Sequence, residues 1–176
     1  MPEPPFRPLD NLRTLAAHQV RFVVIGGYGT FLLGSALLTR DADICPDPDA
    51  ENLRRLCRAL EEMNARLRTT TEPEGVPFKC TELLLSQMSM LNLVTDNGDF
   101  DLSFRPAASD GYPDLVANAV DVDIGGFVVK VAALQDIIRS KETANRDKDR
   151  VALPQLYALR DEIAARETAP RRRKGT

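Results

Sequence analysis

The sequence predicts an α/β or α+β domain in which helices flank a mixed β-sheet. The first half of the chain alternates helical and strand patterns, beginning with a short helix and the apolar strand at residues 21–25. Two pairs of strands follow, with turns at residues 96–98 and 125–126, and such turns are typical of hairpins. Two helical segments come last. This mixture of alternation and hairpins favours a mixed sheet covered by helices.

Length and composition indicate one globular domain. The chain has 176 residues, of which 43% are hydrophobic and 28% charged. We expect a flexible lead at residues 1–9, a single domain at 10–167 and a basic disordered tail at 168–176. No apolar run approaches the ~20 residues that span a bilayer, and the first residues do not resemble a signal peptide. A cytoplasmic protein without a membrane partner is therefore expected.

The net charge, the three cysteines and the single histidine argue against several classes of function. The net charge is −3 although the tail Arg171–Lys174 is basic, so no overall basic excess marks a nucleic-acid binder. Cys45, Cys57 and Cys80 form no Cys-x-x-Cys pair, which argues against zinc, and we expect all of them as reduced thiols. His18 is the only histidine, and nothing near it supports a Ser-His-Asp or Cys-His mechanism.

Capping residues and apolar runs predict the first helices and strands. Asp10 is expected to cap a helix over residues 11–19. The strand at 21–25 ends at Gly26 and Gly27, and a helix is expected over 28–38. A second strand then carries Asp41 and Asp43.

The middle of the chain contains an amphipathic helix and a loop. Asp47 and Pro48 are expected as the N-cap and first residue of a helix, whose apolar residues recur at three- and four-residue steps as far as Leu67. Residues 69–79 are rich in proline and glycine and predict a loop. A short helix is expected at 81–87.

The last third alternates strands and helices. Strands are predicted at 90–94 and 99–104, and a hairpin at 120–131. A helix is expected at 134–144. Pro154 should open the final helix, which runs to about residue 166, because a proline inside a helix costs about 3 kcal/mol.

Two aspartates one residue apart give the strongest functional signal. Side chains alternate along a strand, so Asp41 and Asp43 project from the same face. Paired carboxylates suit Mg²⁺, which often shares its ligands with substrate phosphates. Gly26 and Gly27 lie just upstream and expose backbone N–H groups to which a triphosphate could bind.

A third carboxylate is expected on a later strand. Asp101 lies between the apolar residues Phe100 and Leu102, whereas Asp99 is closer to the turn and is the alternative choice. If the two acidic strands are neighbours, Asp41, Asp43 and Asp101 converge and could hold two Mg²⁺ ions about 3.5–4 Å apart.

A charged segment at residues 139–150 offers a cation for phosphate. Lys141 could reach a triphosphate, and Asp149 could orient Lys141 or a water molecule. The alternative is an exposed helix end with ordinary i,i+4 pairs, and spacing alone favours that alternative. Two other phosphate-binding motifs are excluded. Gly27-Tyr28-Gly29 is not followed by the third glycine of a Rossmann fingerprint, and the segment from Gly29 to Gly34 is followed by Ser35 where a Walker A loop has lysine.

The order Gly26-Gly27, helix, then Thr39-x-Asp41-x-Asp43 resembles the nucleotidyltransferase superfamily with the DNA polymerase β-type fold. Residues 134–156 are similar to the lysine and aspartate motifs of AbiEii/MenT-type toxin nucleotidyltransferases. The resemblance covers about residues 22–156. It departs from many members in having Tyr28 where they have a phosphate-contacting serine.

The resemblance implies a transfer of a nucleotide from an NTP. Its implied metal ligands are Asp41, Asp43 and Asp101, and Lys141 and Asp149 complete the implied catalytic residues. The implied nucleotide-binding residues are Gly26, Gly27, Thr30, Arg40 and Lys141. The implied acceptor is RNA, namely the 3′ end of tRNA, and the implied partner is a cognate antitoxin.

Three alternatives stay open at this level. The same chemistry could modify a small molecule, such as an aminoglycoside, or a protein hydroxyl. A degenerate nucleotidyltransferase fold could bind a partner without catalysis. The acids could also be solvated strand ends, since Asp-x-Asp pairs are common.

Overall fold

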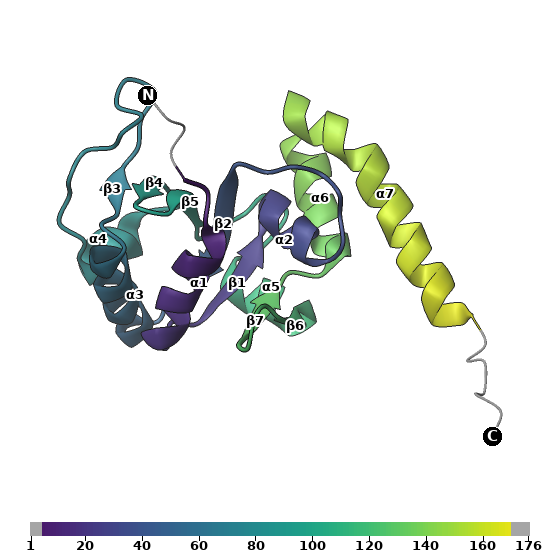
Figure 1. Ribbon diagram of the computed structural model, residues 1–176, viewed down its shortest axis with the longest axis horizontal. Coiled ribbons are helices and arrows are strands. Elements are labelled where there is room, and N and C mark those ends of the chain that lie inside the picture. The colour runs from purple at the N-terminus through teal and green to yellow at the C-terminus, as the bar shows by residue number, and fades with distance from the viewer. Residues whose placement is uncertain (1–4, 170–176) are drawn as a thin grey trace.

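The computed structural model describes residues 5–169, and Figure 1 shows a central sheet with helices on both sides. Within these residues the sheet has seven strands in the order β3-β4-β5-β2-β1-β7-β6. The strands are β1 (Phe22–Ile25), β2 (Asp41–Pro46), β3 (Arg66–Leu67), β4 (Met90–Thr95), β5 (Gly98–Ser103), β6 (Val120–Asp123) and β7 (Val128–Val131). The helices are α1 (Pro8–Ala17), α2 (Gly26–Leu32), α3 (Ala50–Glu62), α4 (Glu82–Gln87), α5 (Tyr112–Asn118), α6 (Leu134–Ala144) and α7 (Asp147–Thr168).

The sheet is mixed, as predicted. The β4–β5 and β6–β7 hairpins and the β1–β2 pair are antiparallel. The β2–β5 and β1–β7 pairs are parallel. The predicted fold class, a mixed sheet flanked by helices, is therefore confirmed.

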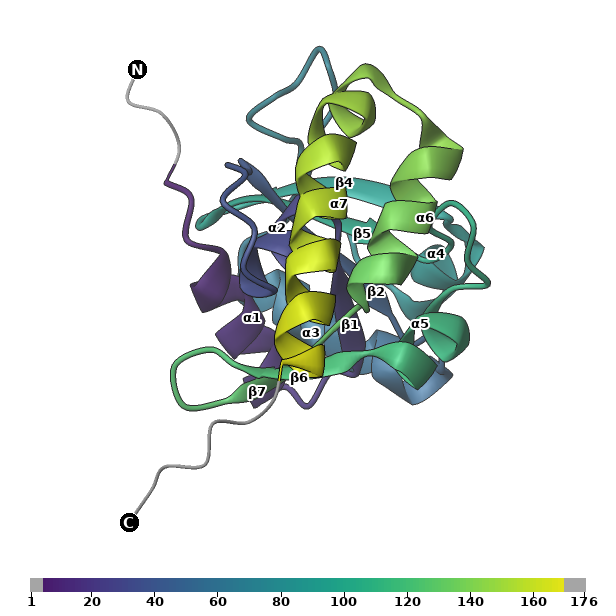
Figure 2. The ribbon, with the colours of Figure 1, turned by 90° about the vertical axis from the view of Figure 1, so that its right-hand side faces the viewer.

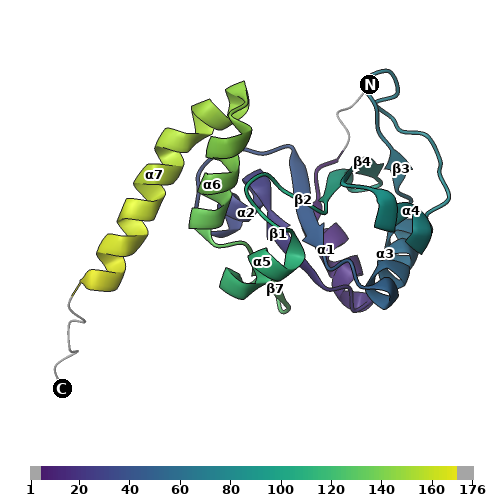
Figure 3. The same cartoon turned by 180° about the vertical axis from the view of Figure 1, so that it is seen from behind.

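The two faces of the sheet have different surroundings. On one face, the central strands pack with residues of α1 and α3 in the largest core cluster, which contains Val24, Ile44, Phe100, Leu15 and Leu56 among others. On the other face, β1 residues pack against Leu115 of α5 and Ile137 of α6. Figure 2 shows α6 and α7 in front of this second face, and Figure 3 shows α7 projecting beyond α6 at the end of the molecule opposite α3 and α4.

Two of the early helices begin elsewhere than expected. α1 begins at Pro8, and Asp10 lies in its first turn; proline is suited to this position because its fixed φ matches the helix. The Arg7 N–H donates to the Asn97 carbonyl at 2.8 Å, which ties part of the predicted flexible lead to the β4–β5 turn. α2 spans Gly26–Leu32 instead of residues 28–38, and Gly34 follows it with a φ of +106°.

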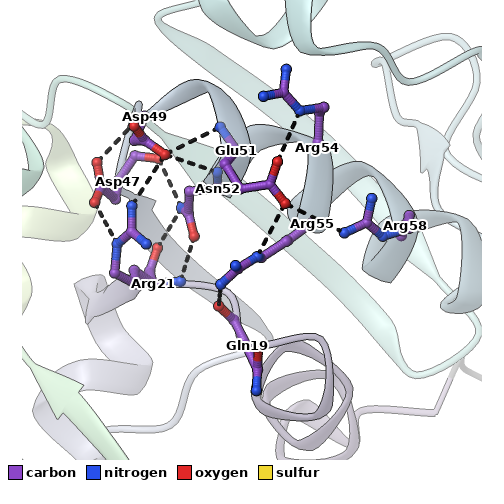
Figure 4. Close-up of polar contacts among 9 residues, drawn as sticks. All are labelled: Gln19, Arg21, Asp47, Asp49, Glu51, Asn52, Arg54, Arg55 and Arg58. Atoms are coloured by element: carbon purple, nitrogen blue, oxygen red, sulfur yellow. Dashed lines mark hydrogen bonds and ion pairs between the residues drawn. The ribbon is translucent and has the colours of Figure 1, made fainter.

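Asp49, and not Asp47, caps α3. The Asp49 carboxylate accepts from the N–H groups of Glu51 and Asn52. Asp47 instead accepts from Arg21 Nε at 2.7 Å, as Figure 4 shows. The predicted apolar run also ends early, since Leu67 belongs to β3.

The C-terminal helix differs most from the prediction. α7 begins at Asp147, and Pro154 lies inside it. Asp149 accepts from the Arg146 N–H at 3.1 Å and so closes the first turn of the helix well before the proline. Pro154 is exposed, so the carbonyl that loses its helical partner lies near solvent. β3 and α5 were not anticipated, and residues 170–176 of the predicted tail lie outside the described residues.

The expectation of three reduced thiols is wrong. Cys57 of α3 and Cys80 form a disulfide with a Cα–Cα distance of 5.4 Å. Cys45 alone is a free thiol among the described residues, and burial raises its pKa to about 12. The pairing was missed because Cys57 and Cys80 are 23 residues apart and meet only when the loop before α4 folds back onto α3.

Candidate metal centre and adjoining cavity

The parallel pairing of β2 with β5 brings three aspartates together. Asp43 lies opposite Asp101 in the register, and Asp41 lies opposite Asp99. One carboxylate oxygen from each of Asp41, Asp43 and Asp101 lies within 4.8 Å of the other two. Since side chains alternate along each strand, all of them emerge on the sheet face that carries α5 and α6.

Gly26 makes room for this cluster. It has a φ of +65°, and a Cβ atom at this position would meet Asp43 Oδ2 at 2.6 Å. Gly27 approaches Thr39 in the same way, with its hypothetical Cβ 3.0 Å from Oγ1. The Thr39 hydroxyl in turn donates to Asp41 Oδ1 at 3.0 Å. The Gly-Gly pair thus lets the β1–α2 turn pass close to the carboxylates.

Burial and mutual repulsion disfavour the ionised form of the aspartates in this cluster. Burial raises the pKa of Asp43 to about 7, with further increases from the charges of Asp41 and Asp101. The positive charges of Lys148 and Lys141 lower the pKa of Asp43 and offset part of this increase. Burial also raises the pKa of Asp101, against the opposite effect of Arg68.

The donor set of the cluster fits a hard divalent cation. Carboxylate oxygens are the ligands that Mg²⁺ and Mn²⁺ favour, and neighbouring strands hold these ones in place. Because burial and like charges raise the pKa of Asp43, a cation at this point would also relieve the repulsion. Asp41, Asp43 and Asp101 could therefore hold Mg²⁺.

A cavity of about 620 Å³ adjoins the cluster. Asp41 and Asp43 line it, whereas Asp101 does not belong to the lining. The basic side chains that line it are Arg40, Arg105, Lys141, Arg146 and Lys148. Gly26, Gly27 and Thr30 line it as well. Carboxylates, backbone amides and cations are thus gathered around one cavity.

All five predicted nucleotide-binding residues line this cavity, but their side chains differ in how freely they could contact a ligand. Arg40 is exposed. Thr30 is buried and its hydroxyl donates to the Gly27 carbonyl at 2.8 Å, so this hydroxyl already has a partner within the helix.

Lys141 and Asp149 meet between α6 and α7. Lys141 Nζ lies 3.3 Å from Asp149 Oδ1, and Arg146 Nε donates to Asp149 Oδ2 at 2.7 Å. Burial raises the pKa of Asp149, but the bonds from Arg146 and the charge of Lys141 outweigh it and hold the pKa below its ordinary value. Asp149 is fully buried, so this segment is not the exposed helix end of ordinary i,i+4 pairs.

Arg68 is the residue that the sequence reasoning missed. Its Nη2 contacts Asp101 Oδ1 at 2.9 Å and Oδ2 at 3.1 Å. It follows the two-residue strand β3, at the start of a segment that was predicted only as a loop. No local signal identifies it, because it reaches Asp101 across β4.

Comparison with known proteins finds similar solved structures but no similar sequence family. No family model matches the chain, and neither does a curated protein sequence. The lincomycin-bound crystal structure of the lincosamide antibiotic adenylyltransferase LnuA is similar, with a TM-score of 0.59 and 13% identity over 86% of this chain and 95% of LnuA.

Two further solved structures are similar over most of their length. The nucleotidyltransferase-like protein TM1012 from Thermotoga maritima has a TM-score of 0.52 and 20% identity over 87% of this chain and 95% of its own. The solution structure of the antibiotic-resistance factor ANT(2'')-Ia has a TM-score of 0.52 and 13% identity over 91% of this chain and 92% of its own. The chain therefore has the fold of nucleotidyltransferases.

Proposed function

We propose that this protein transfers a nucleoside monophosphate from an NTP to a hydroxyl group of a small-molecule acceptor. The observation that carries the proposal is the convergence of Asp41, Asp43 and Asp101 beside a cavity with basic side chains. The likeness to solved nucleotidyltransferase structures supports it.

The acidic residues would hold the metal in this proposal. Asp41, Asp43 and Asp101 would bind Mg²⁺, two ions in the arrangement that the sequence predicts, and bound Mg²⁺ neutralises charge on phosphate oxygens. In the alternative arrangement, Asp101 would accept the proton of the attacking hydroxyl instead of binding the second ion. A bond forms between the acceptor oxygen and the α-phosphorus, the bond to the β-phosphate oxygen breaks, and pyrophosphate leaves.

The remaining residues would bind and orient the donor. The backbone N–H groups of Gly26 and Gly27 would donate to the triphosphate, with Thr30 shaping the same wall of the cavity. Arg40 and Lys141 would neutralise phosphate charge, and Asp149 would hold Lys141 in position. Positioning and charge stabilisation account for most catalysis of this kind.

The walls of the cavity favour a small acceptor with an apolar part. Leu38, Met90 and Val151 line the cavity with exposed fractions of 100%, 55% and 75%, which is unusual for large apolar side chains unless something covers them. A polycation would meet the five basic side chains in the lining and is disfavoured. LnuA was solved with lincomycin bound, and this supports an antibiotic-like acceptor.

Transfer to the 3′ end of tRNA by a toxin with a cognate antitoxin is the second candidate. The Lys141–Asp149 pair, on which the AbiEii/MenT resemblance depends, favours it, and so do the cavity's basic side chains. It uses the same donor chemistry and differs only in the acceptor.

The direct test supplies both acceptors. The purified protein is incubated with Mg²⁺ and each α-³²P-labelled NTP, together with either hydroxylated antibiotics including lincomycin or total tRNA. Label on a small molecule is expected, and D43N should abolish it. Label on tRNA instead would support the toxin hypothesis, and label on the protein itself would support a protein acceptor. Metal binding without any transfer would support a binding module.

A further inference from the structure

We infer that Arg68 competes with a divalent cation for Asp101 and so sets the metal affinity of the site. The inference rests on the metal-binding part of the proposed function. It assigns a positioning role to a residue outside the cavity lining, on the opposite side of Asp101 from β2.

The contacts of Arg68 place its guanidinium directly on the third carboxylate. Nη2 contacts both oxygens of Asp101, at 2.9 and 3.1 Å, and Nε lies 3.5 Å from Asp99 Oδ2. The Leu93 N–H donates to Asp101 Oδ1 at 3.1 Å as well. The side chains of Arg68 and Asp101 are only 26% and 13% exposed, so solvent screens this pair weakly.

The backbone of Arg68 is anchored, so the contact is built into the sheet. The Arg68 N–H donates to the Asn92 carbonyl at 2.9 Å, which extends the β3–β4 pairing by one residue. Asn92 is itself opposite Asp101 in the β4–β5 register. The guanidinium therefore spans one strand to reach its partner.

A cation in the cluster has to share Asp101 with this guanidinium. Both oxygens of Asp101 accept from Arg68 Nη2, so a cation that binds either oxygen shares that oxygen's negative charge with the guanidinium. The positive charges of Arg68 and of a divalent ion bound to the same carboxylate would also repel each other. Both effects weaken metal binding relative to a site without Arg68.

Removal of the guanidinium should therefore tighten metal binding. In the absence of nucleotide, R68Q is expected to bind Mn²⁺ roughly tenfold more tightly than the wild type, as measured by electron paramagnetic resonance of free Mn²⁺. R66Q is the matched control: Arg66 lies two residues away in β3, but its side chain contacts Asp96 and the Glu74 carbonyl. R66Q should bind Mn²⁺ like the wild type.

A variant without the Asp101 carboxylate separates competition for this carboxylate from a general effect of the positive charge of Arg68. In D101N, the additional R68Q change should tighten binding much less than it does when Asp101 is present, because only the charge repulsion between Arg68 and the metal remains. Equal tightening with and without Asp101 would overturn the inference. If R68Q does not fold, R68M carries the test: it keeps the length of the side chain and removes the positive charge, so tighter binding is expected and an unchanged affinity would refute the inference.

The outcomes distinguish this inference from the proposed function. Equal Mn²⁺ affinity in R68Q and the wild type, with nucleotidyl transfer intact, would overturn the role of Arg68 and leave the function standing. Lack of Mn²⁺ binding by every variant would overturn the metal centre and with it both proposals.

Discussion

Asp43 lies where burial and two neighbouring carboxylates oppose its negative charge. These effects raise its pKa to about 7, so the metal-free fold carries an electrostatic cost at neutral pH. Residues held in this way commonly serve function at the expense of stability. The cost should be measurable as a dependence of stability on pH.

D43N should therefore stabilise the metal-free protein at pH 8. The folded-state pKa of about 7 lies above the unfolded value of about 3.9, so the wild type loses stability as pH rises from about 4 to 7 and then levels off. We expect D43N to unfold with a free energy up to about 4 kcal/mol higher at pH 8, and with little difference at pH 4. Urea denaturation in EDTA measures both values.

The control for D43N is D161N, since the Asp161 side chain is exposed and pairs with the adjacent Arg160. It should change stability little at either pH. Added Mg²⁺ should stabilise the wild type but not D43N, because ligands stabilise the state that binds them. A D43N protein that is less stable than the wild type at pH 8 would contradict this account.

Gly26 should be irreplaceable for a different reason. In G26A the new Cβ would lie 2.6 Å from Asp43 Oδ2, in addition to the backbone strain at a φ of +65°. We expect a loss of about 1–3 kcal/mol in stability together with weaker Mn²⁺ binding. G34A is the matched control, since Gly34 has a φ of +106° but open space around it. It should lose stability and keep metal affinity; equal metal affinity in G26A would refute the contact.

At the scale of elements, α6 and α7 are joined by a buried ion pair. Asp149 of α7 is fully buried and is bound by Lys141 of α6 and by Arg146 at the start of α7. The helices also share apolar contacts between Ile138 and Leu156. Since Lys141 and Arg146 line the cavity, this junction fixes the basic wall of the candidate site.

D149N should loosen this junction and alter its response to acid. A buried pair that loses one charge typically costs about 3–5 kcal/mol, and here the largely buried Lys141 would keep its charge without this partner. The pKa of Asp149 is held below its unfolded value, so its contribution is present above about pH 4 and is lost as pH falls through the folded pKa. D149N should therefore show a flatter acid limb in its stability curve.

Thermal unfolding between pH 2 and 7 tests this prediction. D147N is the control, because the Asp147 side chain is 96% exposed in the same turn of the helix. Its stability should change by less than about 0.5 kcal/mol. An unchanged acid limb in D149N would contradict the assigned role.

Helices and strands that are defined by neighbouring residues could be predicted from the sequence. The helix predicted at residues 134–144 matches α6, because apolar periodicity defines both of its ends. The face shared by Asp41 and Asp43 follows from strand alternation alone. By contrast, Pro154 misplaced the start of α7, because the capping contact of Asp149 and an exposed position outweigh the usual cost of proline.

Features that depend on distant contacts were not predictable. The parallel β2–β5 register decides that Asp43 faces Asp101, and no local pattern encodes it. Arg68 and the Cys57–Cys80 disulfide were missed for the same reason, since each depends on how residues 66–80 fold back onto the rest of the chain.

At the scale of the whole molecule, the disulfide ties the segment before α4 to α3. Cys57 and Cys80 are separated by 23 residues, and closing a loop of this length stabilises a fold by about 3 kcal/mol in the chain-entropy model. Among the described residues, none of the helices has the length and apolarity to cross a membrane.

Reduction should therefore lower the stability of the whole domain. Wild-type protein in dithiothreitol and the C57S/C80S variant should both lose about 3 kcal/mol in urea denaturation. C45S does not remove the disulfide, so it should still respond to dithiothreitol. Identical denaturation curves with and without reductant would show that the disulfide does not form.

The strand order has a consequence for how the protein is made. Because β2 at residues 41–46 pairs with β5 at residues 98–103, the carboxylates meet only after more than half of the polypeptide exists. A nascent chain still attached to the ribosome, with residue 101 inside the exit tunnel, lacks one third of the acidic trio. A divalent ion held by these aspartates would therefore find all three carboxylates only in a chain in which β2 and β5 have already paired.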